Sequence, residues 1–311
     1  MKKYSIFVVA IFLLGALIFF QVFVPLRGSE EKVLFHIEKG EGNEEISIHL
    51  EKEGLIRSSF TFRLYVLATG AFYTLKAGDY ELNFSMSVAE IAHKIASGDI
   101  AKQTLTIIEG WNRKEIAIYL KEKGIAHAED LGNAEYATLE GYLFPDTYGV
   151  RKEAGLEEVI ALMQKNFDKK FTQQMKDTAS AQKKTIQQIV IMASLIEKEV
   201  RTSEDKRIVS GILWKRLDIG MPLQVDATIT YITGKQKISV ADIKIDSSYN
   251  TYKYRGLPAG PIANPGLESI QAALNPEANP YLYYLSTPEG QTIFSKTLQE
   301  HNQAKAQYLA E

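Results

Sequence analysis

The apolar residues of this chain form one long uncharged run at the start, followed by short periodic segments. Residues 4–26 contain no charged side chain. Residues 5–24 alone are long enough to cross a hydrocarbon core of about 30 Å at about 1.5 Å per residue. Bulky residues at 22–25 stand where a cleavable signal peptide would carry small ones. The pattern therefore predicts an uncleaved transmembrane anchor.

Charges before the anchor predict its orientation. Lys2 and Lys3 precede the apolar run, and basic residues favour the cytoplasmic side of a membrane. We expect a single-pass protein of the cell (inner) membrane with a cytoplasmic N-terminus. Everything after Arg27 would then be extracytoplasmic.

An internal repeat follows the anchor. Residues 35–55 (FHIEKGEGNEEISIHLEKEGL) align without gaps to residues 105–125 (LTIIEGWNRKEIAIYLKEKGI). Each copy predicts a strand, a glycine turn, an amphipathic helix and a terminating glycine. A weaker echo covers residues 77–98, where Ser87 is the expected N-cap of a helix.

These strand–helix units resemble LysM-like modules. The resemblance implies binding to cell-wall glycan. The alternative is that the units are spacers which hold a second domain away from the membrane, since such strand–helix units occur in many proteins and fold does not fix function.

After Asp130 the repeat pattern ends, and longer helical segments and short strands are predicted. Residues 156–177 and 207–217 have helical periodicity, and residues 189–200 predict an apolar helix with Thr185 and Gln188 as a capping box at its start. Short strands are expected at 281–286 and 291–295 around a turn. We predict an α+β fold with an anchor at 1–27, a LysM-like repeat region at 28–130 and a catalytic domain at 131–311.

Composition excludes several classes of function. The net charge is only −2, without a basic block, which argues against a nucleic-acid partner. The chain has no cysteine, and its histidines are scattered without a zinc motif, so we expect no metal and no cofactor. S-x-x-K sequences occur, for example at 180–183 and 203–206, but no K-T-G follows them, which disfavours a penicillin-binding enzyme.

Two glutamates end the apolar helix at 189–200, IVIMASLIEKEV. At about 100° per residue, Glu197 falls within the apolar stripe and Glu199 lies on its flank. Periodicity alone therefore favours Glu197 as the more buried carboxyl. A carboxyl desolvated in this way could stay protonated near neutral pH and act as a general acid.

Five segments stand in order along the chain and carry a resemblance to a known family. They are EGYLFPDTY (140–148), ASLIEKE (193–199), RLDIGMPLQVDATITY (216–231), YNTYKYRGLPAGPIANPG (249–266) and FSKTLQEHN (294–302). Together with the anchor and the repeats they resemble the endolytic murein transglycosylases, the MltG or YceG-like family.

The resemblance implies a membrane-anchored enzyme with peptidoglycan glycan strands as substrate. Such an enzyme cleaves the MurNAc–GlcNAc β-1,4 bond within a strand and leaves 1,6-anhydroMurNAc ends. It would terminate the elongation of nascent strands beside the wall-synthesis enzymes.

The resemblance also assigns the catalytic residue. Lysozyme-like transglycosylases place their acid at a helix end in a pattern similar to I-x-x-E-S/T, which matches Glu199. Val200 departs from that pattern. In such enzymes one glutamate protonates the leaving oxygen and then accepts the proton of the muramic acid C6 hydroxyl.

Several polar and aromatic residues are candidates for substrate binding. Two of them could orient sugar hydroxyls, or alternatively cap a turn: Gln224 and Asp226. Four more combine flat rings with hydrogen-bonding groups, although core tyrosines beside an Asx turn would give the same pattern: Tyr249, Asn250, Thr251 and Tyr252.

Two other functions remain open from the sequence. A non-catalytic glycan-binding scaffold of the wall-synthesis complex would need only the repeats. A muramidase-type hydrolase would need a second carboxylate, such as Asp226, at a suitable separation from the first.

Overall fold

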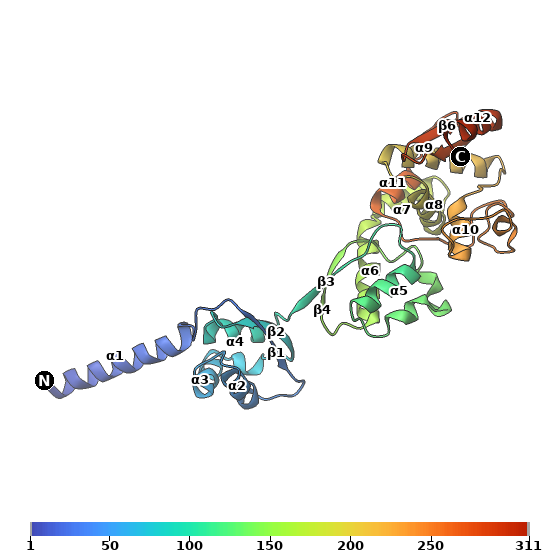
Figure 1. Ribbon diagram of the computed structural model, residues 1–311. Coiled ribbons are helices and arrows are strands. Elements are labelled where there is room, and N and C mark those ends of the chain that lie inside the picture. The colour runs from blue at the N-terminus through green and yellow to red at the C-terminus, as the bar shows by residue number, and fades with distance from the viewer. Residues whose placement is uncertain (1, 310–311) are drawn as a thin grey trace. The chain divides into compact units, whose positions relative to one another are not determined.

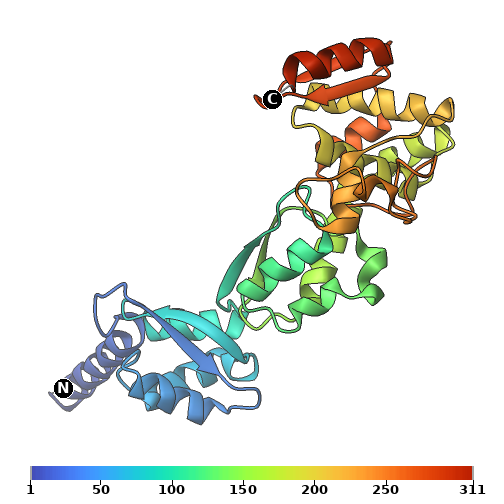
Figure 2. The same ribbon diagram turned by 45° about the vertical axis from the view of Figure 1, so that its right-hand side comes forward.

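The computed structural model describes residues 2–309, apart from the side chains of residues 2–8, 10, 11 and 14. The chain forms two compact units (Figures 1 and 2). Unit 1 comprises Met1–Gln103 with Gly149–Lys152, and unit 2 comprises Thr104–Tyr148 with Glu153–Glu311. The division falls within β3 (Lys102–Thr106) and β4 (Thr147–Arg151), which pair in a two-stranded sheet.

The segment predicted as an anchor is helical. It coincides with α1 (Lys2–Phe23), and part of it lies outside the described side chains. Among the residues that the structure describes, no helix combines the length and the apolar character needed to span a membrane.

Unit 1 is built on an antiparallel pair of strands, β1 (Lys32–Ile37) and β2 (Gly78–Asn83). Its helices are α2 (Asn43–Lys52), α3 (Ser59–Thr69) and α4 (Val88–Ser97), with a short turn η1 (Ala71–Tyr73). The predicted strand and helix of the first repeat copy are confirmed, and so is the Ser87 cap, which forms a capping box with Glu90. Helix α3 was not predicted. Ser58 caps its start, and Phe62 and Val66 bury its inner face in the core.

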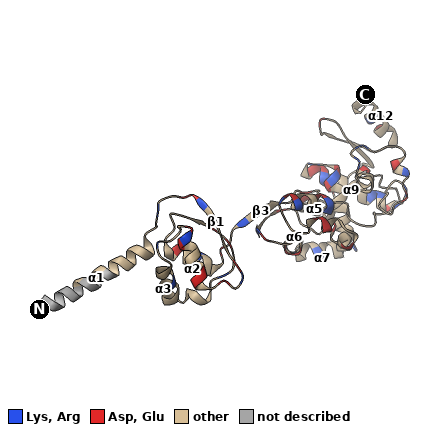
Figure 3. Cartoon of the chain, turned by 60° about the horizontal axis from the view of Figure 1, so that its bottom comes forward, with Lys and Arg blue, Asp and Glu red and all other residues tan. Residues whose placement is uncertain are grey.

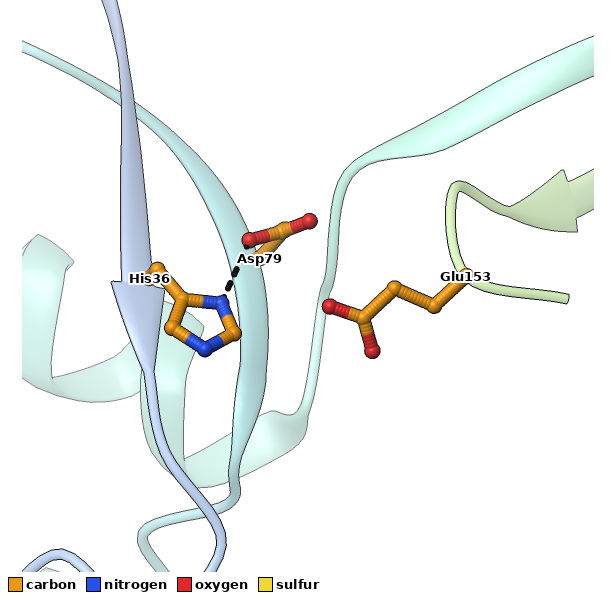
Figure 4. Close-up of side chains that lie close together, drawn as sticks. All are labelled: His36, Asp79 and Glu153. Atoms are coloured by element: carbon orange, nitrogen blue, oxygen red, sulfur yellow. Dashed lines mark hydrogen bonds and ion pairs between the residues drawn. The ribbon is translucent and has the colours of Figure 1, made fainter. Parts of the chain in front are cut away.

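The two strands of unit 1 carry a polar pair on their exposed side. His36 of β1 lies directly opposite Asp79 of β2 in the antiparallel register. Their Nδ1 and Oδ1 atoms are 2.8 Å apart (Figure 4). This cross-strand pair adds to the register that the buried residues Phe35 and Tyr80 define.

Unit 2 begins with the second repeat copy, β3 followed by α5 (Arg113–Glu122). Its other elements are η2 (Ala128–Gly132), η3 (Ala134–Leu139), α6 (Leu156–Lys170), α7 (Gln173–Ala181), α8 (Ile186–Glu199), α9 (Ser203–Asp218), α10 (Asp226–Thr233), η4 (Asp242–Lys244), α11 (Leu267–Leu274), β5 (Tyr283–Ser286), β6 (Thr292–Ser295) and α12 (Leu298–Tyr308). The apolar helix α8 lies at the centre and packs against α9 and α11 (Figure 1). Its residues 189–196 are all buried in the main core of the unit.

The predicted single helix at 156–177 is wrong, because the structure divides it into α6 and α7. Phe171 leaves helical geometry at ψ 79° and inserts its ring into the core, where it is 1% exposed. Thr172 then starts a new helix by accepting a hydrogen bond from the N–H of Met175. A buried aromatic ring followed by a capping threonine outweighs the continuous amphipathic pattern.

Other local predictions in unit 2 are confirmed. Thr185 and Gln188 form the expected capping box at the start of α8. The two C-terminal strands form an antiparallel hairpin, β5 with β6, with Pro288 and Gly290 in the turn. Helix α12 packs against both strands of this hairpin (Figure 2).

The compact units divide the chain differently from the predicted ranges 28–130 and 131–311. The second repeat copy belongs with α8, because it is bonded to the family motifs of unit 2. The N–H of Gly110 donates to the carbonyl of Asn264 at 2.9 Å, and the N–H of Arg113 donates to Glu140 at 3.1 Å. The two repeat copies, although similar in sequence, therefore belong to different compact units.

Charged residues of both signs are interspersed over the described helices of each unit (Figure 3). Many of them face solvent in local pairs, such as Arg63 with Glu44 and Lys94 with Asp99. Exposed pairs of this kind contribute little to stability, about 0–1 kcal/mol each.

Gly211 of α9 allows the segment that leads to β5 to lie directly on the helix. A Cβ atom at this position would stand 2.0 Å from the carbonyl oxygen of Glu277. We expect Gly211→Ala to lower the free energy of unfolding by about 1–3 kcal/mol or more, because backbone must move to make room. Chemical denaturation of the purified protein measures this loss.

Gly28→Ala is the control, because no atom lies within 4 Å of its added Cβ, its φ is outside the left-handed region and it lies in an exposed segment outside the helices and strands. It should change stability by less than about 0.5 kcal/mol. Equal stability of the two variants would contradict the close approach at Gly211.

Candidate active site

Glu199 is the last residue of α8, after which Val200 adopts extended geometry. The apolar run that precedes it fixes the helix in the core, so the glutamate is held on a rigid support. Its side chain is partly buried and borders a cavity of about 490 Å³.

The residues that line this cavity come from α8, α9, the loop before α10, the first residue of α10, the loop after η4, the hairpin and α12. Its lining comprises Glu199, Arg216, Leu223, Gln224, Asp226, Tyr252, Tyr283, Tyr284, Leu285, Ser286, Leu298, His301, Lys305 and Leu309. The combination of aromatic rings, two carboxyls and cationic groups is typical of a site that binds a polar ligand with flat apolar faces.

The surroundings of Glu199 raise the pKa of its carboxyl to about 7. Burial is the largest cause, and the nearby negative charge of Asp226 acts in the same direction. Three groups oppose the rise: the Tyr284 hydroxyl, which donates at 2.9 Å, the backbone N–H of Ala227 and the charge of Arg216. A substantial fraction of Glu199 is therefore protonated near neutral pH, as general acid catalysis requires.

Arg216 joins the two walls of the cavity. Its guanidinium donates to the carbonyl of Leu282 at 2.7 Å, just before β5, and to the carbonyl of Leu223 at 2.7 Å, just before α10. The side chain is buried, and its guanidinium lies 5.1 Å from the centre of the Tyr283 ring. Removing it would leave buried carbonyls without donors on both walls.

Three of the predicted substrate-binding residues line the cavity. Gln224 has a φ of 53°, a conformation uncommon for a residue with a side chain, and its N–H donates to the carbonyl of Thr251. Asp226 is the first residue of α10 and accepts a hydrogen bond from the Tyr252 hydroxyl. The positive end of the helix dipole also favours negative charge at this position.

The other three predicted residues make internal contacts and do not border the cavity. The side chain of Asn250 holds a turn through the carbonyls of Ile243 and Ile245, and the hydroxyl of Thr251 accepts from the N–H of Val225. Tyr249 packs against Tyr231 with ring centres 5.2 Å apart. Contact of these residues with substrate stays a prediction.

Glu197 is buried as periodicity predicts, but on a different face of α8. Its side chain is 8% exposed and pairs with the buried ammonium of Lys206 at 3.0 Å. Its second oxygen accepts the N–H of Gly266 at 2.9 Å. Glu197 therefore connects α8 to α9 and to the start of α11, and it does not border the cavity.

A second carboxyl with a raised pKa lies in unit 2, away from the cavity lining. Burial raises the pKa of Glu140 to about 7, although it accepts hydrogen bonds from the N–H of Arg113 and the hydroxyl of Tyr231. The amide of Asn264 also donates to it, at 3.1 Å. Glu140 thus ties the second repeat copy to two of the family motifs.

Sequence reasoning missed Arg216, Tyr284 and His301 as cavity residues. Arg216 and His301 lie within the quoted motifs 216–231 and 294–302, and Tyr284 lies in the predicted strand YLYYLS. The only sequence feature that could have identified them is that they are polar or aromatic residues within elements whose other residues pack in the core. Their convergence on Glu199 depends on long-range packing of the hairpin.

The described residues provide no metal site at this cavity. No three ligand atoms from His, Cys, Asp or Glu come together there in the part of the chain that the structure describes. The chemistry available from this chain's own residues is proton transfer by Glu199, with tyrosines and Asp226 beside it.

Comparison with known proteins agrees with the arrangement of the motifs. The model of the YceG-like family matches residues 35–307. A protein of Bacillus subtilis named endolytic murein transglycosylase is 35% identical over 91% of this chain and 87% of its own length. One of the same name from Streptococcus pneumoniae is 30% identical over 92% of this chain, which spans only 60% of that relative. A yceG-like protein of Listeria monocytogenes has a crystal structure that matches 89% of this chain and 100% of its own, with 32% identity and a TM-score of 0.59.

The raised pKa of Glu140 predicts a pH dependence of stability. In the unfolded chain this carboxyl loses its proton near pH 4.5, while in the folded protein it keeps the proton up to about pH 7. Its contribution to the free energy of unfolding is therefore fully present below pH 4.5 and is lost as the pH rises through about 7. A shift of this size corresponds to about 3 kcal/mol.

We expect Glu140→Gln to lose less stability than the parent between pH 5 and pH 8, as measured by denaturant unfolding at both pH values. Glu204→Gln, at an exposed glutamate, is the control and should keep the parental dependence. If the stability of Glu140→Gln changes with pH as much as that of the parent, the carboxyl is ionised throughout this range, and its hydrogen bonds offset the cost of burying its charge.

Proposed function

The chain belongs to the YceG-like family, and we propose that it is a peptidoglycan lytic transglycosylase in which Glu199 is both general acid and general base. The observation that carries this proposal is a single carboxyl with a pKa of about 7 at the border of a cavity rich in tyrosines. The names of the B. subtilis and S. pneumoniae relatives support the reaction class.

The reaction proceeds in two proton transfers. Protonated Glu199 donates to the oxygen of the β-1,4 bond between MurNAc and GlcNAc as that bond breaks. The Glu199 carboxylate then takes the proton from the C6 hydroxyl of the same muramic acid, whose oxygen attacks C1. The products are a free GlcNAc 4-hydroxyl and a 1,6-anhydroMurNAc end, and no water is consumed.

Neighbouring groups support both protonation states of Glu199. Burial and Asp226 favour the neutral acid before cleavage, whereas Tyr284, the N–H of Ala227 and Arg216 stabilise the carboxylate after it. A pKa near the working pH lets one group serve as donor and acceptor. Cleavage within strands, and termination of nascent strands beside wall-synthesis enzymes, are parts of the proposal.

Hydrolysis is the second candidate, because Asp226 borders the same cavity. An inverting or retaining hydrolase uses two carboxyl groups on either side of the bond. Here the Tyr252 hydroxyl already donates to Asp226, which favours a binding role for that carboxylate. Product analysis by mass spectrometry separates the two reactions, since hydrolysis leaves reducing ends.

We also propose that residues 4–26 anchor the protein in the cell membrane with unit 2 outside the cytoplasm. The support is the uncharged sequence after Lys2 and Lys3. An extracytoplasmic location would give the enzyme access to the wall.

Glu199→Gln should reduce the release of anhydromuropeptides from purified sacculi by about 10²–10⁴-fold, because an amide cannot donate and recover the proton. The parental rate should fall as pH rises above about 7, where the folded carboxyl loses its proton. Mass spectrometry of timed digests measures both effects.

Glu197→Gln is the matched control on the same helix. It should lose some stability through Lys206 but keep measurable turnover. Turnover near the parental rate in Glu199→Gln, together with an inactive but folded Glu197→Gln, would move the acid to Glu197. Parental activity in both variants would show that neither glutamate of α8 is the catalytic acid.

The topology can be tested with a C-terminal fusion. A reporter enzyme that works only outside the cytoplasm, joined after Glu311, should be active in cells, and the same fusion lacking residues 1–27 should be inactive. Activity of a cytoplasm-specific reporter at the same position would contradict the proposed orientation.

A further inference from the structure

Unit 1 exposes five large apolar or aromatic side chains on α3 and on the turn that follows it. Phe60, Leu64 and Leu67 of α3 are 66%, 47% and 61% exposed, and Phe72 and Tyr73 of η1 are 42% and 84% exposed. At about 100° per residue, the three positions on α3 fall within about 60° of one another around the helix. We call these five residues the apolar row. Contiguous exposed apolar side chains mark surfaces that contact a protein or a membrane.

The core of unit 1 does not require the apolar row. Phe62 and Val66 already bury the inner face of α3. The second repeat copy offers an internal comparison, because the segment that follows its helix, residues 126–139, contains η2 and η3 and exposes no large apolar side chain. The row therefore belongs to the copy that directly follows the uncharged segment 4–26.

Helix α3 is held against the end of that uncharged segment. It contacts α1 near the last turn of α1 (Figure 1). The Thr61 hydroxyl donates to the side-chain oxygen of Gln21 at 3.3 Å, and the rings of Tyr65 and Phe23 have centres 6.3 Å apart. Arg57, just before α3, donates to the two backbone carbonyls that follow α1. The place where the apolar segment ends is thus fixed beside α3.

The apolar row adjoins the side of α3 that faces α1. Around the helix, Leu64 lies about 60° from Thr61 in one direction, and the core residue Phe62 lies about 100° from it in the other. The row is therefore turned away from the core and continues the side that contacts α1. Phe19 and Phe23 in the last two turns of α1 are exposed as well, so apolar surface extends from α1 onto α3.

The charge of this region suits a lipid surface. Residues 58–78 contain Arg63 and Lys76 but no acidic residue. Interfacial helices combine an apolar face with basic side chains that are attracted to anionic lipids, and they bury that face by about 5–10 Å at the boundary between headgroups and acyl chains.

The proposed anchor places α3 at the same depth. If residues 5–24 cross the hydrocarbon core, Gln21 and Phe23 lie close to its boundary. Their contacts with Thr61 and Tyr65 then hold α3 beside the headgroups. Tyrosine side chains are enriched at this boundary, because their rings are apolar and their hydroxyls polar.

We propose that the apolar row is a membrane-docking surface, which inserts into the headgroup region of the bilayer that α1 crosses. The inference rests on the proposed anchoring by residues 4–26 and goes beyond it, since it assigns a second lipid contact to the folded part of unit 1. An anchor alone keeps unit 1 near the bilayer, whereas the row determines which face of unit 1 meets the lipid.

The absence of cysteine from the sequence allows a site-specific test. Phe60→Cys and Leu67→Cys are labelled with nitrobenzoxadiazole in the full chain and reconstituted in vesicles of phosphatidylglycerol and phosphatidylethanolamine. Both labels should be quenched by lipid-borne doxyl groups and shielded from iodide present on both sides of the membrane. Ile48→Cys is the matched control, at an exposed apolar residue of α2 in the same unit, and its label should respond to iodide and not to doxyl lipid.

A further substitution excludes insertion by the fluorophore itself. Leu64→Asp, added to the labelled Leu67→Cys chain, should restore quenching by iodide, because a charged side chain is costly to bury in the acyl region. Leu64 is half-exposed, so the fold should tolerate the change. Doxyl quenching that Leu64→Asp leaves unchanged would show that the label and not the row enters the lipid, which overturns the proposal.

A label at Ile18→Cys, within the proposed anchor, separates failure of the docking surface from failure of the anchor. Doxyl quenching at Ile18 without quenching at Phe60 and Leu67 would overturn the docking surface and leave the anchor intact. No doxyl quenching at any of the three positions would overturn both. Labels at Phe60 and Leu67 that are shielded from iodide but insensitive to doxyl lipid would mean that a second copy of the chain covers the row, which also contradicts the proposal.

Discussion

The central constraint in unit 2 is a carboxyl at the C-terminal end of a buried helix. The core fixes α8 through eight consecutive buried residues, so Glu199 cannot move to solvent as an exposed glutamate would. The negative end of the helix dipole and the loss of water both disfavour its charge. Tyr284, the N–H of Ala227 and Arg216 offset part of that cost, and the pKa settles at about 7. The elements that supply these groups, β5, α10 and α9, are the walls of the cavity.

Buried polar residues then determine how those walls are held. Arg216 bonds to the backbone before β5 and before α10, and Glu197 joins α8 to Lys206 and Gly266. Asn264 likewise connects two segments: its side-chain amide donates to the carbonyl of Trp111, and its side-chain oxygen accepts from the N–H of Leu143. A buried polar group costs free energy unless it is paired. Each of these side chains is therefore satisfied in one arrangement of the elements, which makes the cavity specific in shape.

Patterns with local causes were predictable from the sequence. Helix α8, the Thr185 and Ser87 caps, the C-terminal hairpin and both repeat copies follow from periodicity and capping chemistry. The break at Phe171 was not predictable, since it depends on where an aromatic ring finds space in the core. For the site, periodicity identified Glu197 as buried but could not show that Lys206 and Gly266 occupy it. Contacts between residues more than sixty positions apart, such as Tyr284 with Glu199, leave no periodic signal.

The repeat shows why similar sequences can serve different ends. The matched positions, including buried Ile46 with Ile116 and Leu50 with Leu120, maintain a strand, a turn and a helix in both copies. What differs is the outer face and the attachment of the turn. In the first copy the unit closes on itself through β1 and β2. In the second, Gly110 and Trp111 bond to Asn264, and Arg113 bonds to Glu140, so the module becomes part of the body that carries Glu199. The similarity between the copies thus reflects their shared buried positions. The place of each copy in the structure follows instead from the polar groups with which its turn forms hydrogen bonds.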